Sequence, residues 1–295
     1  MKLRRALYGV LLVLQAGLVV TGGAVRLTGS GLGCPTWPEC TPGSYTPVPH
    51  QPEKQLHVWI EFGNRLLTFA LVAAALAVLI NVLYRQRRDL RLLAIGQVLG
   101  IFGQGILGGI TVLTQLHPAT VAAHLLLSII LIGGATSLYD RRESGIIRIK
   151  PAEKIAANLS RVHVYLTFLA IALGTLVTGS GPHAGDEDAP RFGFDIRTVA
   201  SIHAESVIAL LGVTLALYVA VRSNPLHKRR LFIFLAIALG QGAIGYIQYF
   251  TGIPEILVAA HLLGSTLVWI SAWRLRLAIT TSPVRTQPSS AGENS

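Results

Sequence analysis

Charged residues are scarce in this sequence. Asp, Glu, Lys and Arg make up 13% of its 295 residues, whereas an ordinary soluble domain has about 25%. This shortage excludes an intrinsically disordered chain and a protein that coats nucleic acid. Acidic residues are scarcer than basic ones, with 14 Asp and Glu against 25 Lys and Arg. The basic residues fall in short clusters without interleaved aromatic residues, so we expect no nucleic-acid partner.

Cysteine is almost missing as well. The sequence has two, Cys34 and Cys40, which is too few for a disulfide scaffold. Their spacing is not the paired spacing of a zinc site. They can form one disulfide at most.

Long apolar runs are abundant instead, because 52% of the residues are hydrophobic. A helix crosses a lipid core of about 30 Å with about 20 apolar residues, and such runs recur eight times. Backbone groups in lipid must be paired within their own segment, so each run is a helix. The sequence predicts an all-α polytopic membrane protein with eight transmembrane helices, at residues 6–26, 57–84, 92–114, 118–139, 158–180, 198–221, 230–251 and 254–277.

The distribution of basic residues predicts the orientation. Twenty of the 25 lie on the N-terminal side of the membrane, within residues 2–5, 85–91, 141–161, 222–230 and 274–285. The positive-inside rule therefore predicts a multi-pass protein of the cell membrane with both termini in the cytoplasm. Segments 27–56 and 181–197 then face the outside, where an oxidising environment permits a Cys34–Cys40 disulfide. This bond is interpreted either as a staple of a proline-rich loop or as a redox-active pair.

The chain contains an internal repeat. Val121-Ala-Ala-His124-Leu-Leu126 recurs 137 residues later as Val258-Ala-Ala-His261-Leu-Leu263. Gly103-Gln-Gly105 recurs at the same offset, and Thr28-Gly-Ser-Gly31 recurs at Thr178. The repeat predicts two pseudo-symmetric four-helix bundles, with a linker between them and a tail after them. The predicted parts are a bundle at 1–140, a cytoplasmic linker at 141–157, a bundle at 158–280 and a disordered tail at 281–295.

Both halves also match the pattern G-x-G-x-x-G. A dinucleotide site requires a strand before this pattern, and a membrane helix offers none. We therefore interpret the glycines as places where helices approach closely. They are Gly103, Gly105, Gly108, Gly240, Gly242 and Gly245.

Three histidines lie at similar depth inside the predicted helices. His124, His203 and His261 are each about 10 Å from the outer end of a span, where ionisable residues are costly and typically functional. His203 and His261, on separate helices, predict the two axial ligands of a haem iron in the second bundle. A helix-to-helix hydrogen bond is the alternative for a single histidine. We expect no ligand role for the histidines in loops or near the boundaries, His50, His117, His163, His183 and His227.

The first half departs from this pattern. Asn64 stands where the spacing of the second half predicts a histidine, and an amide is a poor iron ligand. Glu61 lies on the same helical face, with Arg65 four residues later and His57 a further turn out. Glu61 is interpreted either as the partner of an ion pair with Arg65 or as a carboxylate beside a macrocycle, where desolvation tunes it as a base.

In these residues the sequence resembles the heme A synthase family. The resemblance runs through all eight spans and rests on Thr28-Gly-Ser-Gly-Leu-Gly-Cys-Pro-Thr-Trp-Pro-Glu-Cys40, on Glu61-Phe-Gly-Asn-Arg65 and on the repeated histidine helices. It implies an oxidoreductase that converts the methyl group of heme O to the formyl group of heme A for terminal oxidases. Water is the implied oxygen source. The implied partners are heme O, the heme O synthase that delivers it, an electron acceptor and the lipid bilayer.

The resemblance also implies roles for particular residues. Glu61 is the expected catalytic carboxylate and His124 the expected ligand of heme O, with Asn64, Arg65 and His57 around it. His203 and His261 are the expected ligands of haem b, and Cys34 and Cys40 the expected outer-loop disulfide. The family has histidine where this chain has Asn64. We therefore expect five-coordinate iron on His124, or a water in the sixth position, rather than ligation by His57.

Two other classes of protein share these features. A di-haem b-type electron-transfer cytochrome would hold two permanent haems and would gain nothing from Glu61. A haem transporter or chaperone would use the same pockets without chemistry.

Overall fold

The computed structural model describes residues 2–49, 51–143 and 154–280. His50, residues 144–153 of the expected linker and the expected tail at 281–295 lie outside this part. The described part contains eight helices, all long and apolar enough to cross a membrane. This confirms the predicted all-α class with eight transmembrane helices. The helices are α1 Lys2–Leu27, α2 Gln55–Tyr84, α3 Arg88–Leu113, α4 Pro118–Arg141, α5 Lys154–Ser180, α6 Ile196–Val221, α7 Pro225–Phe250 and α8 Glu255–Thr280.

Four helices begin four or five residues earlier than predicted, at Lys2, Arg88, Lys154 and Pro225. Hydropathy marks only the stretch that lies in lipid, whereas helical hydrogen bonding continues into the polar interface. The start of α7 shows a local cause. The Asn224 side chain accepts hydrogen bonds from the backbone N–H groups of Leu226 and His227. With proline at the first helical position, this fixes a helix start before the apolar run.

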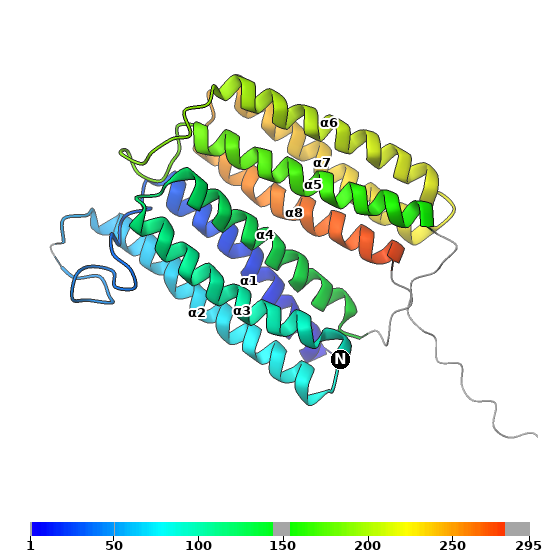
Figure 1. Cartoon of the computed structure of the whole chain (residues 1–295), viewed down its shortest axis with the longest axis horizontal. Helices are drawn as coiled ribbons and strands as arrows, with labels where there is room; N and C mark the ends of the chain where they lie inside the picture. The colour runs from blue at the N-terminus through cyan, green and yellow to red at the C-terminus, as the bar shows by residue number, and fades with distance from the viewer. Residues whose placement is uncertain (1, 50, 144–153, 281–295) are drawn as a thin grey trace, which may run out of the picture.

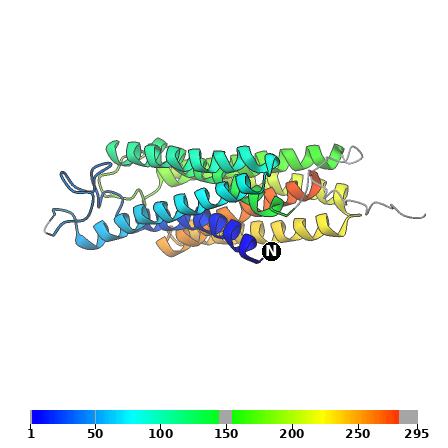
Figure 2. The ribbon, with the colours of Figure 1, turned by 90° about the horizontal axis from the view of Figure 1, so that it is seen from below.

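Helices α1–α4 pack together as one group and α5–α8 as a second (Figure 1). The groups meet along α1, α4, α5 and α8. The long loops at 28–54 and 181–195 lie at the same end of the helices (Figures 1 and 2). We call this the loop end, and the opposite end, with residues 2–5, 85–88, 141–143 and 222–230, the basic end.

The contact between the groups is mostly apolar. Val19, Ile129, Ile132, Val164 and Trp269 form one buried cluster that draws on α1, α4, α5 and α8. Burial of such side chains is the main source of packing free energy in the contact. The outer faces of the helices are also apolar but exposed, as a membrane protein requires. Phe69, for example, is 72% exposed.

Polar contacts join the groups at both ends of this interface. At the basic end, Asp140 at the end of α4 accepts hydrogen bonds from Arg230 of α7 at 3.2 Å and Arg274 of α8 at 2.9 Å. At the loop end, Arg26 of α1 donates to the carbonyl oxygens of Thr178, at 2.7 Å, and His183. The two groups are therefore held in one relative position from both sides.

Candidate functional site

The second group of helices brings His203 and His261 together. His203 projects from α6 and His261 from α8, and their ring centroids are 6.4 Å apart with an interplanar angle of 70°. Two imidazoles that bind one metal from opposite sides, with metal–nitrogen bonds of about 2 Å, hold their centroids about 6 Å apart. The observed separation therefore fits a single iron between the two rings.

Hydrogen bonds leave one nitrogen of His203 available to a metal. Its Nδ1 lies 2.9 Å from the carbonyl oxygen of Ala170 on α5. Because a carbonyl can only accept, Nδ1 carries the proton and Nε2 keeps its lone pair. A backbone carbonyl behind a ligating imidazole is the usual arrangement at metal sites.

The α7 helix holds the opposite ring. Gln241 Nε2 donates to the carbonyl oxygen of His261 at 2.5 Å. Gly245 lies against the ring, where an added Cβ would be 3.4 Å from His261 Cε1. Nδ1 of His261 is buried and has no hydrogen-bond partner among the described residues. Such an unpaired ring nitrogen is costly in a protein interior unless something else occupies the pocket. The donor set thus fits a haem.

The first group repeats half of this arrangement. Gln104 Nε2 donates to the carbonyl oxygen of His124 at 3.1 Å. An added Cβ on Gly108 would lie 3.0 Å from His124 Nε2. Gln104, Gly108 and His124 each precede their second-half counterparts by 137 residues. Helices α3 and α4 therefore hold His124 in the same way as α7 and α8 hold His261.

The first group differs from the second at the position that corresponds to His203. Asn64 projects from α2, the counterpart of α6, and its Oδ1 accepts a hydrogen bond from the Thr21 hydroxyl of α1 at 2.7 Å. A side chain of α1 thus orients Asn64, as a carbonyl of α5 orients His203. Within the described ranges, the Asn64 amide nitrogen has no hydrogen-bond partner. The first-group counterparts of the two imidazoles are therefore one imidazole, His124, and one amide, Asn64.

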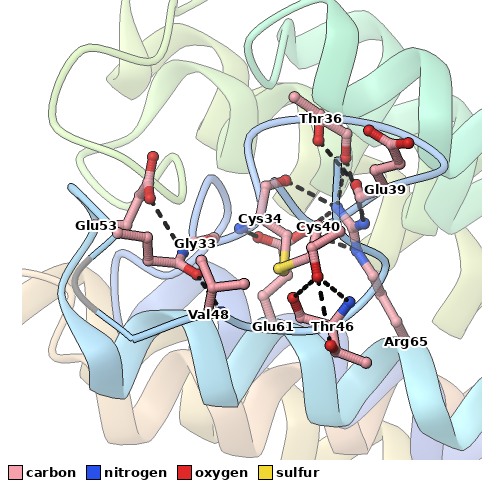
Figure 3. Close-up of a disulfide and its surroundings, with 12 residues drawn as sticks. Gly33, Cys34, Thr36, Glu39, Cys40, Thr46, Val48, Glu53, Glu61 and Arg65 are labelled. Atoms are coloured by element: carbon pink, nitrogen blue, oxygen red, sulfur yellow. Dashed lines mark hydrogen bonds and ion pairs between the residues drawn. A yellow bond between two sulfur atoms is a disulfide. The ribbon is translucent and has the colours of Figure 1, made fainter. Parts of the chain in front are cut away.

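Glu61 links α2 to the first outer loop (Figure 3). It is only 6% exposed. Oε1 accepts from Arg65 Nη2 at 2.7 Å and Oε2 from the backbone N–H of Cys34 at 2.7 Å. The ion pair expected as one interpretation of Glu61 is therefore present. Oε1 also accepts from Arg65 Nε at 3.1 Å. The ion pair therefore engages Oε1 and not Oε2, so it does not exclude the interpretation as a base.

Arg65 ties the same loop from the other side. Figure 3 shows its guanidinium reaching into the curve of the loop, where it donates to carbonyl oxygens of Cys34, Thr36 and Glu39. The shortest of these bonds is 2.8 Å, to Cys34. A guanidinium can serve several acceptors at once because it carries five N–H donors in a fixed plane.

The predicted disulfide between Cys34 and Cys40 is formed. Both cysteines are fully buried and pack on Val58 of α2. Gly33 allows this close approach, since an added Cβ would lie 2.6 Å from the backbone oxygen of His57. The disulfide loop thus rests directly on the helix that carries Glu61 and Asn64.

The structure also defines the surroundings of two other histidines. The ring of His57 lies beside Gly29 of the outer loop. His163, expected near a membrane boundary, is buried within α5 because that helix begins at Lys154. Its ring packs on Phe234 with centroids 4.3 Å apart. The start of α5, four residues earlier than predicted, explains why His163 is buried.

The interpretation of the repeated glycines holds mainly for the third of each triplet. Gly108 and Gly245 face the histidine rings, whereas an added Cβ on Gly105, Gly240 or Gly242 would meet nothing within 4 Å. Gln104 and Gln241, which lie between the first two glycines of each triplet, contact the histidine helices. They were not among the predicted site residues. Their repetition at the offset of the histidines is the signal that could have identified them.

Fold and site together define a class: an eight-helix membrane protein with two related histidine pockets, one of which suits a haem with two axial imidazoles. The sequence profile of the COX15-CtaA family, described as cytochrome oxidase assembly protein, matches residues 5–273. The chain belongs to this family.

Curated relatives carry the name heme A synthase. The protein of Geobacillus kaustophilus is 29% identical over 126 residues, which are 42% of this chain and 37% of the relative. The protein of Listeria monocytogenes is 30% identical over 179 residues, 58% of this chain and 57% of the relative. The chain thus matches between about two fifths and three fifths of the length of these relatives. The resemblance to the heme A synthase family is confirmed.

Proposed function

We propose that this protein is a heme A synthase that oxidises a methyl group of heme O to the formyl group of heme A. The observation that carries the proposal is the difference between two otherwise matched pockets. His203 and His261 form a pocket with two imidazoles, which suits a permanent haem b. In the first half, the position that matches His203 holds Asn64, so His124 has no second histidine opposite it there. Weaker ligation suits a molecule that enters as substrate and leaves as product.

The proposed division of labour follows the two halves. Residues 158–280 hold haem b through Nε2 of His203 and a ring nitrogen of His261, and haem b supplies one-electron transfer when bound. Residues 1–140 form the catalytic half, with His124 on the iron of heme O and Asn64 on the opposite side. The gap of about 10 Å along α2 between Asn64 and His57 argues against His57 as the second ligand.

Glu61 is the proposed base. Conversion of a methyl to a formyl group adds the oxygen of one water and releases four electrons and four protons, which an electron acceptor and the solvent must take up. Water is a weak nucleophile, and a carboxylate within hydrogen-bond reach assists by accepting its proton. Arg65 positions Glu61 through their 2.7 Å contact.

The proposed setting is the cell membrane, with both termini in the cytoplasm and the disulfide loop outside. This orientation rests on the concentration of Lys and Arg at the basic end. Heme O synthase is the proposed donor of the substrate, which is too apolar to cross water unassisted.

Co-expression with a heme O source, followed by chromatography of the extracted haems, tests the proposal. We expect heme b together with heme O and heme A. Two equivalents of heme b alone would indicate a di-haem cytochrome, and heme O without heme A would indicate a transporter or chaperone.

The Glu61→Gln variant tests the base. It should keep both haems but stop formyl production, because an amide cannot accept the proton of water. Glu205→Gln is the matched control, since Glu205 is an exposed carboxylate on α6. A normal yield of heme A from Glu61→Gln would refute the role.

A further inference from the structure

A groove at the basic end takes no part in the proposed haem chemistry. It has a volume of about 550 Å³ and lies between the end of α6 and the first turns of α7. Its lining combines three cationic side chains with apolar ones. The residues are Arg222, Pro225, Lys228, Arg229, Phe232, Ile233 and Ala236.

The lining from α7 forms one continuous stripe. Its members recur every three or four residues between Pro225 and Ala236, so they share a helical face. The stripe is about 16 Å long, with cations in its first turns and apolar side chains beyond them. Phe232 and Ile233 are 48% and 46% exposed. Tyr218 of α6 packs on Phe232, with ring centroids 5.8 Å apart.

The charge of the groove is not compensated by protein. Arg222, Lys228 and Arg229 form no ion pair with the acidic residues that the structure describes. The nearby Asp140 is engaged by Arg230 and Arg274 instead.

The corresponding turn of the first half is different in this respect. Asp89 occupies the position that matches Leu226, 137 residues earlier. It pairs with Arg87 at 2.8 Å. The second half thus has an apolar residue next to three cations where the first half has an acidic one.

We propose that this groove binds an anionic phospholipid. The phosphate lies among the three cations and an acyl chain follows the apolar stripe along α7. Basic pockets between transmembrane helices recognise such head groups by charge, while the lipid tail excludes water from the apolar stripe. A free phosphate ion would leave the exposed Phe232 and Ile233 without a partner, so the length and polarity of the stripe favour a lipid.

Native mass spectrometry of the full-length protein in detergent, titrated with phosphatidylglycerol or phosphatidylcholine, tests the proposal. Each basic residue near a lipid surface contributes about a fivefold gain in affinity. The triple variant Arg222→Gln, Lys228→Gln and Arg229→Gln should therefore bind phosphatidylglycerol about 100-fold more weakly. The matched control is the triple variant Arg85→Gln, Arg88→Gln and Arg91→Gln, which removes equal charge from the corresponding turn. Its affinity should fall less than tenfold.

A second variant separates the groove from simple surface charge. Ala236→Trp keeps every cation but fills the apolar stripe, and should weaken phosphatidylglycerol binding at least tenfold. Equal losses in the two triple variants, or equal binding of phosphatidylcholine by the unmodified protein, would overturn the proposal. So would an unchanged affinity in Ala236→Trp, or displacement of the lipid by millimolar inorganic phosphate. Elution of each variant at the volume of the unmodified protein in gel filtration verifies its fold.

Discussion

At the scale of single residues, Asn64 in the first half stands where the second half has His203. The Thr21 hydroxyl orients Asn64, whereas the Ala170 carbonyl orients His203. The repeat in the sequence was enough to predict His124 and His261 as counterparts, because identical neighbours surround them. It could not predict that Thr21 orients Asn64, since a threonine in an apolar run has no distinctive pattern. That contact depends on how α1 packs on α2, which only the fold defines.

The paired histidines lead to a spectroscopic prediction. His203→Ala or His261→Ala should convert the second-half haem from low spin to high spin, because either change removes one of two axial imidazoles. Absorption and electron paramagnetic resonance spectra of the purified variants provide the measurement. His163→Ala, a buried histidine of α5 with no proposed ligand role, is the control and should leave the spectrum unchanged. A retained low-spin signal in both site variants would refute the assignment.

Restoring the missing histidine should change the first pocket. Asn64→His places a second imidazole at the position matched to His203, so heme O loaded into this variant should become six-coordinate and low spin. It should also leave the protein more slowly. Asn64→Leu removes the amide without adding a ligand and should stay high spin. A low-spin first-half haem in the unmodified protein that turns high spin in His57→Ala would instead identify His57 as the ligand.

At the scale of elements, the helices were predictable, but the beginnings of four of them were not. Apolar runs report where the lipid is, whereas caps such as Asn224 report where the helix begins. For the outer loop that packs on α2, only the disulfide between its two cysteines was predictable from the sequence. That the Cys34 backbone would donate to Glu61 required the loop to fold back across 27 residues, and no local pattern encodes such a contact.

The disulfide loop is expected to stabilise the site beneath it. Cys34→Ser with Cys40→Ser should lower the thermal unfolding temperature, because the unfolded loop gains conformational freedom and Glu61 loses a fixed hydrogen-bond donor. Thiol labelling with and without reductant measures the bond itself. We expect no reactive thiol before reduction and two after it, and two free thiols in protein purified without reductant would contradict the bond. Ser30→Ala, a buried loop residue outside the disulfide ring, is the control for loop packing.

At the scale of the whole molecule, the two helix groups meet through an apolar interface with polar contacts at each end. Trp273 adds a contact between them, donating to the Ser137 hydroxyl at 2.7 Å. The separation between the pockets is therefore fixed by α1, α4, α5 and α8 rather than by the segment that joins α4 to α5. A fixed separation would suit the proposed electron transfer between the two halves.

Asp140 is the test of that interface, because it holds one arginine from each of two helices of the opposite group. Asp140→Asn should weaken the contact by about 1 to 3 kcal/mol, since hydrogen bonds to charged groups contribute in this range and partial exposure reduces it. A protease site between α4 and α5 allows the folded chain to be cut, and a tag on α1 then reports whether the second group stays bound in detergent. The uncharged variant should release more of it than the unmodified protein does. Asp89→Asn is the matched control, because the partners of Asp89 among the described residues, Arg87 and Arg141, belong to its own group. Equal retention in the two variants would show that the Asp140 contact does not help to hold the halves together.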